Sequence, residues 1–195
     1  MARHRLAILL SGRGSNFEAI CDAIGDGRIP NAEIVAVISD VADAPGLRRA
    51  ADRGLPAFPL PRGARTRREH EADVVAVLES ARPDLICLAG YMRLLSPEFV
   101  TRYRGRILNV HPALLPKFPG LDVQRRALDA GELESGCTVH FVDEGTDTGP
   151  VILQRRVPIL PGDTVATLSA RILEEEHRAY PEAIAKVLET LPAAQ

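Results

Sequence analysis

The sequence predicts an α/β protein with a Rossmann-like, doubly wound, mostly parallel sheet, an antiparallel edge and a long C-terminal helix. Two observations predict this fold. Short apolar runs typical of buried strands alternate with amphipathic segments typical of helices, which indicates parallel strands joined by helical crossovers. The last two expected strands have no helical segment between them, so we expect them to pair antiparallel at one edge of the sheet.

Each expected strand is a short apolar run bounded by glycine, proline or polar residues. The runs are residues 6–10, 34–39, 57–60, 85–89, 106–110, 138–142 and 151–157. The helical segments between and after them are residues 15–24, 46–53, 66–81, 97–102, 123–130 and 163–189. We expect Ser15 or Asn16 to cap the first helix and Asp163 or Thr164 to cap the last. Pro181 predicts a kink in the last helix.

Length and composition indicate one domain spanning residues 1–195, which is enough chain to bury a core. The 24 Lys and Arg against 26 Asp and Glu leave a net charge of −2, which provides no broad attraction to nucleic acid. The three cysteines form no CxxC pair, which favours reduced thiols over disulfides or a zinc site. The apolar run at 6–10 is too short to cross a membrane. We therefore expect a cytoplasmic protein without membrane or nucleic-acid partners.

The segment 107–120 carries the main candidate chemistry. Asn109 and His111 are two residues apart, so on a strand their side chains point to the same side. Pro112 ends the strand directly after them, and ligands of open α/β sheets bind at the carboxyl ends of strands. Pro116 and Pro119 stiffen the loop that follows. The alternative is that His111 has only a structural role and that its ring forms hydrogen bonds with nearby backbone groups.

The turn Ser-Gly-Arg-Gly-Ser-Asn at 11–16 joins the first expected strand to the first helix. Backbone N–H groups at a helix N-terminus favour an anion there. No Gly-Lys-Ser/Thr follows, so the turn is not a Walker loop, and Phe17 stands where a dinucleotide fingerprint has glycine. The turn therefore predicts a phosphate site for a small substrate. A plain strand-to-helix turn is the alternative.

Two other loops lie at expected strand ends. The first, at 90–95, offers apolar side chains and backbone groups to a flat heterocycle; alternatively Met92 and Leu95 belong to the core. The second, at 143–150, is acidic and contains Asp147, which would raise the pKa of His111 and orient its ring if the two residues met. A solvated hairpin loop is its alternative. We expect His70 at the surface and His140 in the core or beside the site.

Six motifs occur in an order that resembles one family. They are Ser-Gly-x-Gly-Ser-Asn (11–16), Gly-Tyr-Met-Arg-Leu-Leu (90–95), Asn-Val-His-Pro-Ala-Leu-Leu-Pro-Lys-Phe-Pro-Gly (109–120), Thr-Val-His-Phe-Val (138–142), Asp-Thr-Gly-Pro-Val-Ile (147–152) and Glu-His-Arg-Ala-Tyr-Pro (176–181). Together they resemble the folate-dependent phosphoribosylglycinamide formyltransferases of purine synthesis, over nearly the whole chain.

The resemblance implies three sets of site residues. The implied catalytic residues are Asn109, His111 and Asp147. Those implied to bind the ribonucleotide are Gly14, Ser15, Asn16 and Glu176. Those implied to bind the folate are Arg67, Met92, Arg93, Leu94, Leu95, Asn109, Asp143, Glu144, Gly145, Thr146 and Asp147. The chain departs from the usual pattern at Arg13, Ala113, Asp122, Gln124 and Leu173, none of which belongs to the catalytic set.

The implied reaction transfers the formyl group of 10-formyltetrahydrofolate, a co-substrate, to the amine of glycinamide ribonucleotide. His111, held protonated by Asp147, and Asn109 stabilise the oxyanion, and Asp147 assists a proton relay. No metal is implied, the partners are these small molecules, and the chain is a monomer or a homodimer.

Three alternative functions remain at this point. A formyltetrahydrofolate hydrolase would use water as acceptor, but that family usually has an extra N-terminal regulatory domain, for which the chain has no room before residue 6. A methionyl-tRNA formyltransferase would need a C-terminal RNA-binding domain, which we do not expect in a slightly acidic chain that ends at residue 195. A non-catalytic nucleotide-sensing module would need His111 only for stability.

Overall fold

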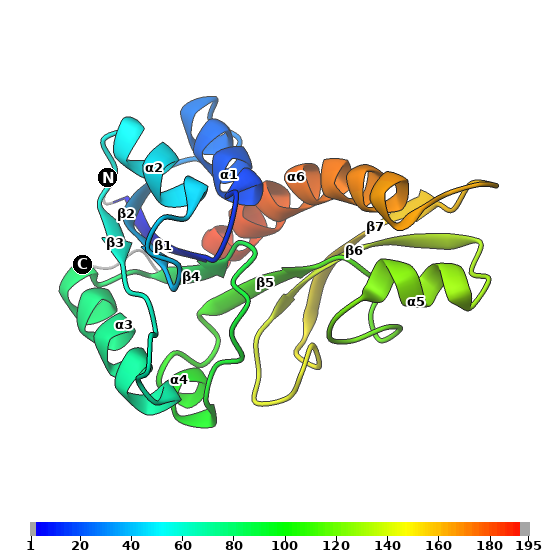
Figure 1. The fold of residues 1–195 in the computed structure, drawn as a ribbon. Coiled ribbons are helices and arrows are strands. Elements are labelled where there is room, and N and C mark those ends of the chain that lie inside the picture. The colour runs from blue at the N-terminus through cyan, green and yellow to red at the C-terminus, as the bar shows by residue number, and fades with distance from the viewer. Residues whose placement is uncertain (1–2, 192–195) are drawn as a thin grey trace.

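A computed structural model describes residues 3–191 as a seven-stranded sheet of order β3-β2-β1-β4-β5-β6-β7, covered by helices on both faces (Figure 1). The strands are β1 (His4–Leu10), β2 (Ala32–Ser39), β3 (Ala57–Pro59), β4 (Leu85–Leu88), β5 (Ile107–His111), β6 (Glu134–Phe141) and β7 (Val151–Pro158). The helices are α1 (Ser15–Gly25), α2 (Pro45–Asp52), α3 (Arg67–Ala81), α4 (Pro97–Arg102), α5 (Val123–Asp129) and α6 (Val165–Thr190).

The predicted fold class is confirmed. Strands β1 to β5 pair in parallel with their neighbours, whereas β6 runs antiparallel to both β5 and β7. The crossover connections bring the carboxyl ends of β1, β4 and β5 to one edge of the sheet. The 11–16, 90–95 and 112–120 loops follow these three strand ends, whereas the 143–150 loop joins β6 to β7.

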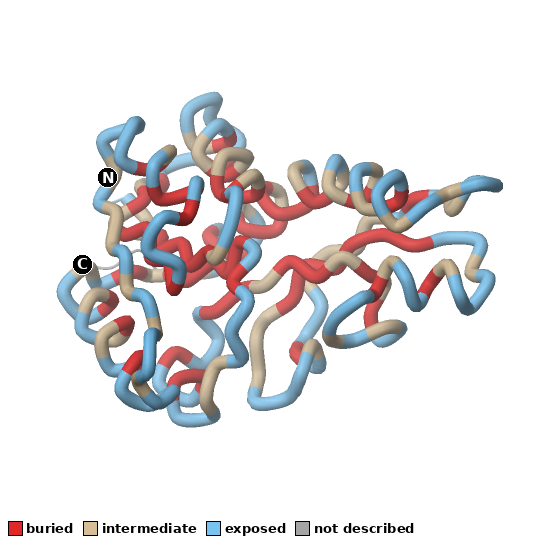
Figure 2. The backbone as a smooth tube through the Cα atoms, in the orientation of Figure 1, coloured by how far each residue is buried: buried red, intermediate tan, exposed pale blue. Residues whose placement is uncertain are grey.

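The core lies on both faces of the sheet, and alternate residues of β1 divide between the two faces. Leu6, Ile8 and Leu10 pack with α1, α2 and α6, while Ala7 and Leu9 pack with α3 and α4. Figure 2 shows the buried backbone concentrated in the central strands. This double burial explains why β1 is a continuous apolar run rather than an alternating one.

The N-terminus of α1 differs from the prediction. Gly14, with φ 78°, is the N-cap, and Ser15 and Asn16 lie in the first helical turn without a side-chain cap. A Cβ on Gly14 would stand 2.8 Å from the Cα of Gly46, so both the positive φ and the close approach of α2 require glycine here. The side chains of Ser15 and Asn16 do not cap the helix, so they can bind partners other than the helix backbone.

Three further expectations are refined by the structure. Thr164, not Asp163, caps α6, and the helix continues through Pro181 to Thr190. His70 is buried rather than exposed, with Nε2 2.7 Å from the carbonyl oxygen of Leu60. Strand β6 begins at Glu134, four residues before the predicted start, because the polar residues there pair with the end of β7.

No helix in residues 3–191 is both long and apolar enough to span a membrane. In the same part of the chain, no group of three His, Cys, Asp or Glu side chains could hold a metal ion.

Tyr180 joins α6 to the two central strands next to the site. Its buried hydroxyl lies 3.0 Å from the carbonyl oxygen of Leu88, the last residue of β4, and 3.1 Å from that of Leu108, the second residue of β5. We expect Tyr180→Phe to lower the free energy of unfolding by about 1–2 kcal/mol, because it removes the donor from two buried carbonyls. Chemical denaturation measures this change.

Tyr103→Phe is the matched control for this prediction. The Tyr103 hydroxyl is buried without a partner in the described residues, so its removal is expected to leave stability unchanged or slightly increased. Equal losses of stability in the two variants would contradict the assigned role of the Tyr180 hydroxyl.

Candidate active site

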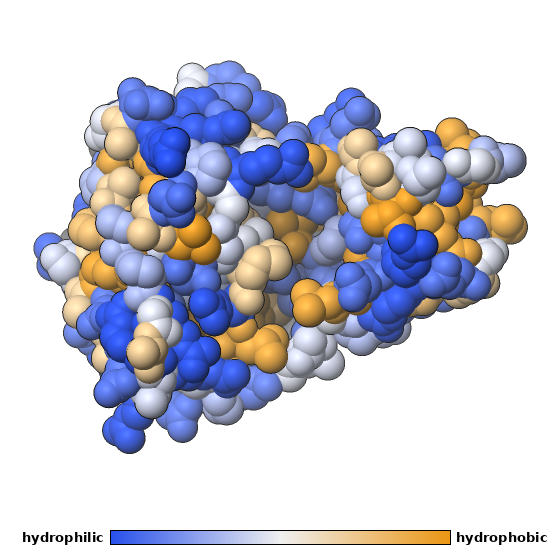
Figure 3. Space-filling model, in the orientation of Figure 1, coloured by the Kyte–Doolittle hydropathy of each residue, from blue (hydrophilic) through white to orange (hydrophobic). Residues whose placement is uncertain are grey.

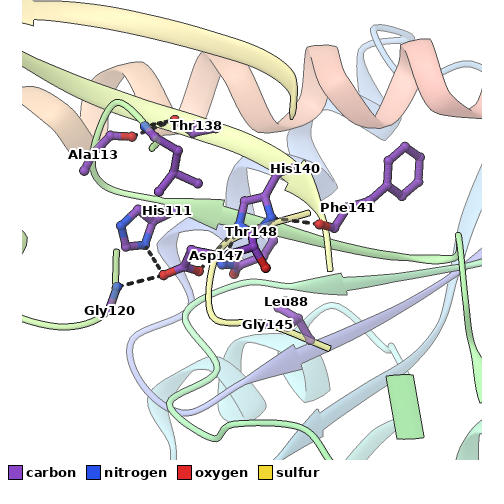
Figure 4. A network of polar contacts seen from close by, with 12 residues as sticks. Leu88, His111, Ala113, Gly120, Thr138, His140, Phe141, Gly145, Asp147 and Thr148 are labelled. Carbon is purple, nitrogen blue, oxygen red and sulfur yellow. Dashed lines mark hydrogen bonds and ion pairs between the residues drawn. The ribbon is translucent and has the colours of Figure 1, made fainter. Parts of the chain in front are cut away.

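Two neighbouring residues of β5 meet residues that are distant in sequence at the carboxyl end of that strand. Strand β5 presents Asn109 and His111, and the loop between β6 and β7 carries Asp147 against them. His140 of β6 pairs in register with Asn109 and completes the group. Figure 4 shows His111, Asp147 and His140 pointing toward one another, with Gly120 to the left of Asp147. The predicted cluster of Asn109, His111 and Asp147 is therefore brought together.

His111 is buried, and both of its ring nitrogens face oxygen atoms. Nδ1 lies 3.3 Å from Oδ2 of Asp147, and Nε2 lies 2.9 Å from the carbonyl oxygen of Phe118. The same Asp147 oxygen accepts a hydrogen bond of 2.9 Å from the Gly120 N–H. The Pro-rich loop after β5 thus fixes both members of the His–Asp pair.

A buried polar network holds that loop. Thr138 Oγ1 donates to the Ala113 carbonyl at 2.7 Å and accepts from the Leu115 N–H at 3.0 Å. Gln154 donates from its side-chain amide to the Leu115 carbonyl at 2.8 Å. Because these groups are satisfied within the protein, the loop that carries Phe118 has little freedom to move away from His111.

The Asp147 charge acts on the pKa of His111 in the expected direction, but a larger effect opposes it. Burial lowers the pKa of His111 below its ordinary value, and this effect exceeds the opposite effects of the Phe118 carbonyl and the Asp147 charge. Burial also raises the pKa of Asp147, but contacts with His140, the Gly120 N–H and His111 together lower it below its ordinary value. Asp147 is therefore ionised near neutral pH, and His111 is mainly neutral.

His140 lies beside the site, which is one of the two positions expected for it from the sequence. Its Nδ1 lies 2.8 Å from the Phe141 carbonyl, and its Nε2 lies 3.3 Å from the side-chain nitrogen of Asn109 and 3.6 Å from Oδ1 of Asp147. A ring that donates from Nδ1 accepts from Asn109 at Nε2, which fixes the orientation of the amide. The register between β5 and β6 supplies this contact, and no local sequence signal reveals it.

A second group of polar residues lies at the N-terminus of α1. The packing of α1 against α6 buries Asn16 and Glu176 together, and the Asn16 amide donates to the Glu176 carboxyl at 2.7 Å. Burial raises the pKa of Glu176 to about 7. The Asn16 Oδ1 atom has no partner in the described residues. Gly14 and Ser15 lie at the helix N-terminus beside them, as predicted.

The two loops expected to enclose a heterocycle differ in structure: the first exposes apolar side chains, and the second is held by internal hydrogen bonds. In the 90–95 loop, Met92 and Leu94 are 68% and 65% exposed, so Met92 does not belong to the core, whereas Leu95 packs against it. In the 143–147 loop, Asp143 accepts hydrogen bonds from the Gly145 N–H at 3.0 Å and from the Thr148 hydroxyl at 2.7 Å. Figure 3 shows the surface hollowed between the body of the protein and the β6–β7 end.

Two of the remaining predicted residues form ion pairs outside the predicted set. Arg93 pairs with Asp40, and Glu144 pairs with Arg104. Arg67 is exposed at the first position of α3 and makes no hydrogen bond or ion pair with another described residue of the predicted set. The arrangement places an oriented amide, a buried His–Asp pair and a helix N-terminus at one edge of the sheet. Such a set is suited to stabilising an oxyanion and moving a proton next to an anionic substrate.

Comparisons with known proteins identify the family. The sequence matches the formyl transferase family over residues 4–184. It is 45% identical to the phosphoribosylglycinamide formyltransferase of Escherichia coli K12 over 177 residues, which cover 90% of this chain and 83% of that protein. It is 54% identical to the trifunctional purine biosynthetic protein adenosine-3 of Drosophila pseudoobscura, covering 94% of this chain but only 14% of that much longer protein.

A solved structure agrees with the sequence matches. The crystal structure of glycinamide ribonucleotide transformylase 1 from Symbiobacterium toebii superposes with a TM-score of 0.93 at 49% identity, covering 96% of this chain and 89% of that one. These findings confirm the resemblance on which the site residues were assigned. The chain belongs to the formyl transferase family of enzymes.

Proposed function

We propose that the chain transfers the formyl group of 10-formyltetrahydrofolate to the amine of glycinamide ribonucleotide in purine biosynthesis. The observation that carries the proposal is the Asn109, His111 and Asp147 cluster at the carboxyl end of β5. The similarity to enzymes named phosphoribosylglycinamide formyltransferase over most of their length supports this choice of reaction. The reaction belongs in the cytoplasm and uses small-molecule substrates.

The ribonucleotide binds at the N-terminus of α1 in this proposal. The unpaired N–H groups that begin at Gly14 and the helix dipole attract its phosphate, with Ser15 supplying a hydroxyl. The glycinamide end then reaches Glu176, whose ionised carboxyl accepts hydrogen bonds from it. Asn16 Oδ1, buried without a partner in the described residues, is a further acceptor for this substrate.

The formyl-folate occupies the region between the 90–95 and 143–147 loops. The exposed side chains of Met92 and Leu94 offer apolar surface to the heterocycle, and backbone N–H and C=O groups of both loops recognise its edge. Arg67, exposed at the start of α3, provides a cation for a carboxylate at the other end of the molecule.

The chemical step begins when the amine nitrogen attacks the formyl carbon and the carbonyl oxygen becomes an oxyanion. Asn109 donates to it with the N–H that His140 does not engage. A mainly neutral His111 accepts a proton at Nδ1, where Asp147 stabilises the imidazolium that forms. Cleavage of the bond between the formyl carbon and the folate nitrogen then completes the transfer, and the proton passes to that nitrogen.

The test is the absorbance change on loss of the formyl group from 10-formyltetrahydrofolate, measured with and without glycinamide ribonucleotide. We expect turnover only when the ribonucleotide is present. Turnover without it would favour the hydrolase alternative. Folate binding without turnover in either case would overturn the proposal in favour of another acceptor or a sensing module.

A further inference from the structure

Two buried carboxylates hold the two ends of the 90–95 loop, and neither belongs to the predicted site. Asp40 follows β2, and Glu71 lies on α3, so the two carboxylates come from different elements. Both are buried, and both form hydrogen bonds with the loop or with residues directly bound to it. Charged groups are rarely buried without a specific partner, so these contacts require an explanation.

Asp40 holds the first half of the loop. Its side chain is only 3% exposed, and Oδ2 accepts a hydrogen bond of 2.7 Å from Nε of Arg93. Oδ1 accepts one of 2.5 Å from the Ser11 hydroxyl. The Ser11 oxygen in turn accepts from the Met92 N–H at 2.8 Å, and the Ser11 N–H donates to the Gly90 carbonyl at 3.0 Å. The ends of β1 and β2 are thus linked to the loop through one carboxylate.

Glu71 holds the other end. Its two oxygens accept hydrogen bonds from both the backbone N–H, at 2.8 Å, and the hydroxyl of Ser96, the residue that follows the loop. Ser96 is also the N-cap of α4, where its hydroxyl oxygen accepts from the Phe99 N–H at 3.2 Å. Glu71 therefore fixes the loop end, the start of α4 and α3 relative to one another.

We propose that Asp40 and Glu71 are positioning residues that fix the backbone of the 90–95 loop for binding the folate co-substrate. The inference rests on the proposed function, because that function assigns the loop to the folate. A flexible surface loop with exposed Met92 and Leu94 would lose conformational entropy on binding. The two carboxylates impose that order before the ligand arrives.

The two residues are expected to differ in one respect. Ser11 begins the glycine-rich turn at 11–16, so Asp40 contacts both the folate loop and the start of the proposed phosphate site. The Glu71 side chain hydrogen-bonds, among residues 3–191, only with Ser96 on the folate side. Loss of Asp40 therefore affects both substrates, whereas loss of Glu71 affects the folate alone.

The experiment compares the KM values of both substrates in Asp40→Ala, Glu71→Ala and the wild type. Loss of hydrogen bonds to a charged group predicts a rise of about 10-fold to 100-fold in the KM for formyl-folate in both variants. The KM for the ribonucleotide is expected to rise in Asp40→Ala and to stay unchanged in Glu71→Ala. A loss of stability without a change in either KM, or equal rises for both substrates in Glu71→Ala, would overturn the inference.

Conservative variants and a control complete the design. Asp40→Asn and Glu71→Gln keep one acceptor oxygen each and are expected to show smaller rises in the same KM values, even if the alanine variants do not fold. Asp163→Asn is the matched control, because the Asp163 side chain is 5% exposed and paired with Arg171 but does not touch the loop. Its KM values are expected to equal those of the wild type.

Hydrogen exchange of the ligand-free protein separates this inference from the proposed function. The N–H groups of Met92 and Ser96 are expected to exchange faster in Asp40→Asn and Glu71→Gln respectively, and at the wild-type rate in Asp163→Asn. If the wild type shows no formyl transfer, the proposed function fails but this measurement still applies. Unchanged exchange at both N–H groups would overturn the positioning role.

Discussion

Asp147→Asn is expected to lower kcat by about 10²–10⁴ while leaving the fold intact. Asp147 adopts a positive φ of 56°, which asparagine tolerates as readily as aspartate, so the exchange adds no backbone strain. The asparagine oxygen still accepts from the Gly120 N–H. What the variant loses is the negative charge 3.3 Å from Nδ1 of His111, which stabilises the imidazolium formed during proton transfer.

The pH dependence tests the same pair. The Asp147 charge favours the protonated form of His111, so its removal lowers the pKa of that ring further below its ordinary value. NMR titration of the ring measures this shift, which the loss of a purely structural contact would not produce. Because the neutral ring is the base, wild-type kcat is expected to rise with pH through the pKa of His111.

Asp129→Asn serves as the control for Asp147→Asn, since Asp129 is an exposed residue at the end of α5. Its kcat is expected to match the wild type. If Asp147→Asn had the same kcat as Asp129→Asn and the wild type, the His–Asp pair would have no part in the mechanism. Asn109 would then be the main residue that stabilises the transition state.

Glu176→Gln is expected to change the pH dependence of both ribonucleotide binding and stability. Burial raises the pKa of Glu176 from 4.5 to about 7 in the folded protein. Between these values the folded protein binds more protons at this group than the unfolded chain does. Its contribution to stability is therefore fully present below about pH 4.5 and is lost as the pH rises to about 7.

The size of this effect follows from the pKa difference, which corresponds to about 3 kcal/mol of unfolding free energy. Glutamine keeps the hydrogen bond from Asn16 but carries no charge at any pH. We therefore expect the variant to gain about 3 kcal/mol relative to the wild type between pH 5 and pH 8, as measured by denaturant unfolding. Glu174→Gln, at an exposed position on the same helix, is expected to show no such pH-dependent gain.

Ribonucleotide affinity is expected to rise with pH, whereas the contribution of Glu176 to stability falls with pH. The wild-type Kd should increase as the pH falls below about 7, because the ionised carboxyl is the form that accepts hydrogen bonds from the substrate. In Glu176→Gln the Kd should be higher than in the wild type at pH 8 and nearly independent of pH. A Kd that keeps the wild-type pH dependence would show that Glu176 does not contact the substrate.

The sequence by itself determined the fold class, because apolar runs of strand length and helical spacing are local properties that burial on a two-sided sheet imposes. It also placed Asn109 and His111 on one side of β5, since side chains two apart on a strand share a face. The motif order was sufficient to indicate the family.

The tertiary structure decided what depends on contacts between distant segments. The register of β5 with β6 brings His140 to Asn109. The cap of α1 is Gly14 rather than Ser15 or Asn16, and the close approach of Gly46 on α2 leaves no room for a side chain there. Burial, which no local pattern measures, lowers the pKa of His111 where the sequence led us to expect a raised value. Residue types and their spacing follow from the chain alone, whereas desolvation and partners separated by many residues exist only in the folded protein.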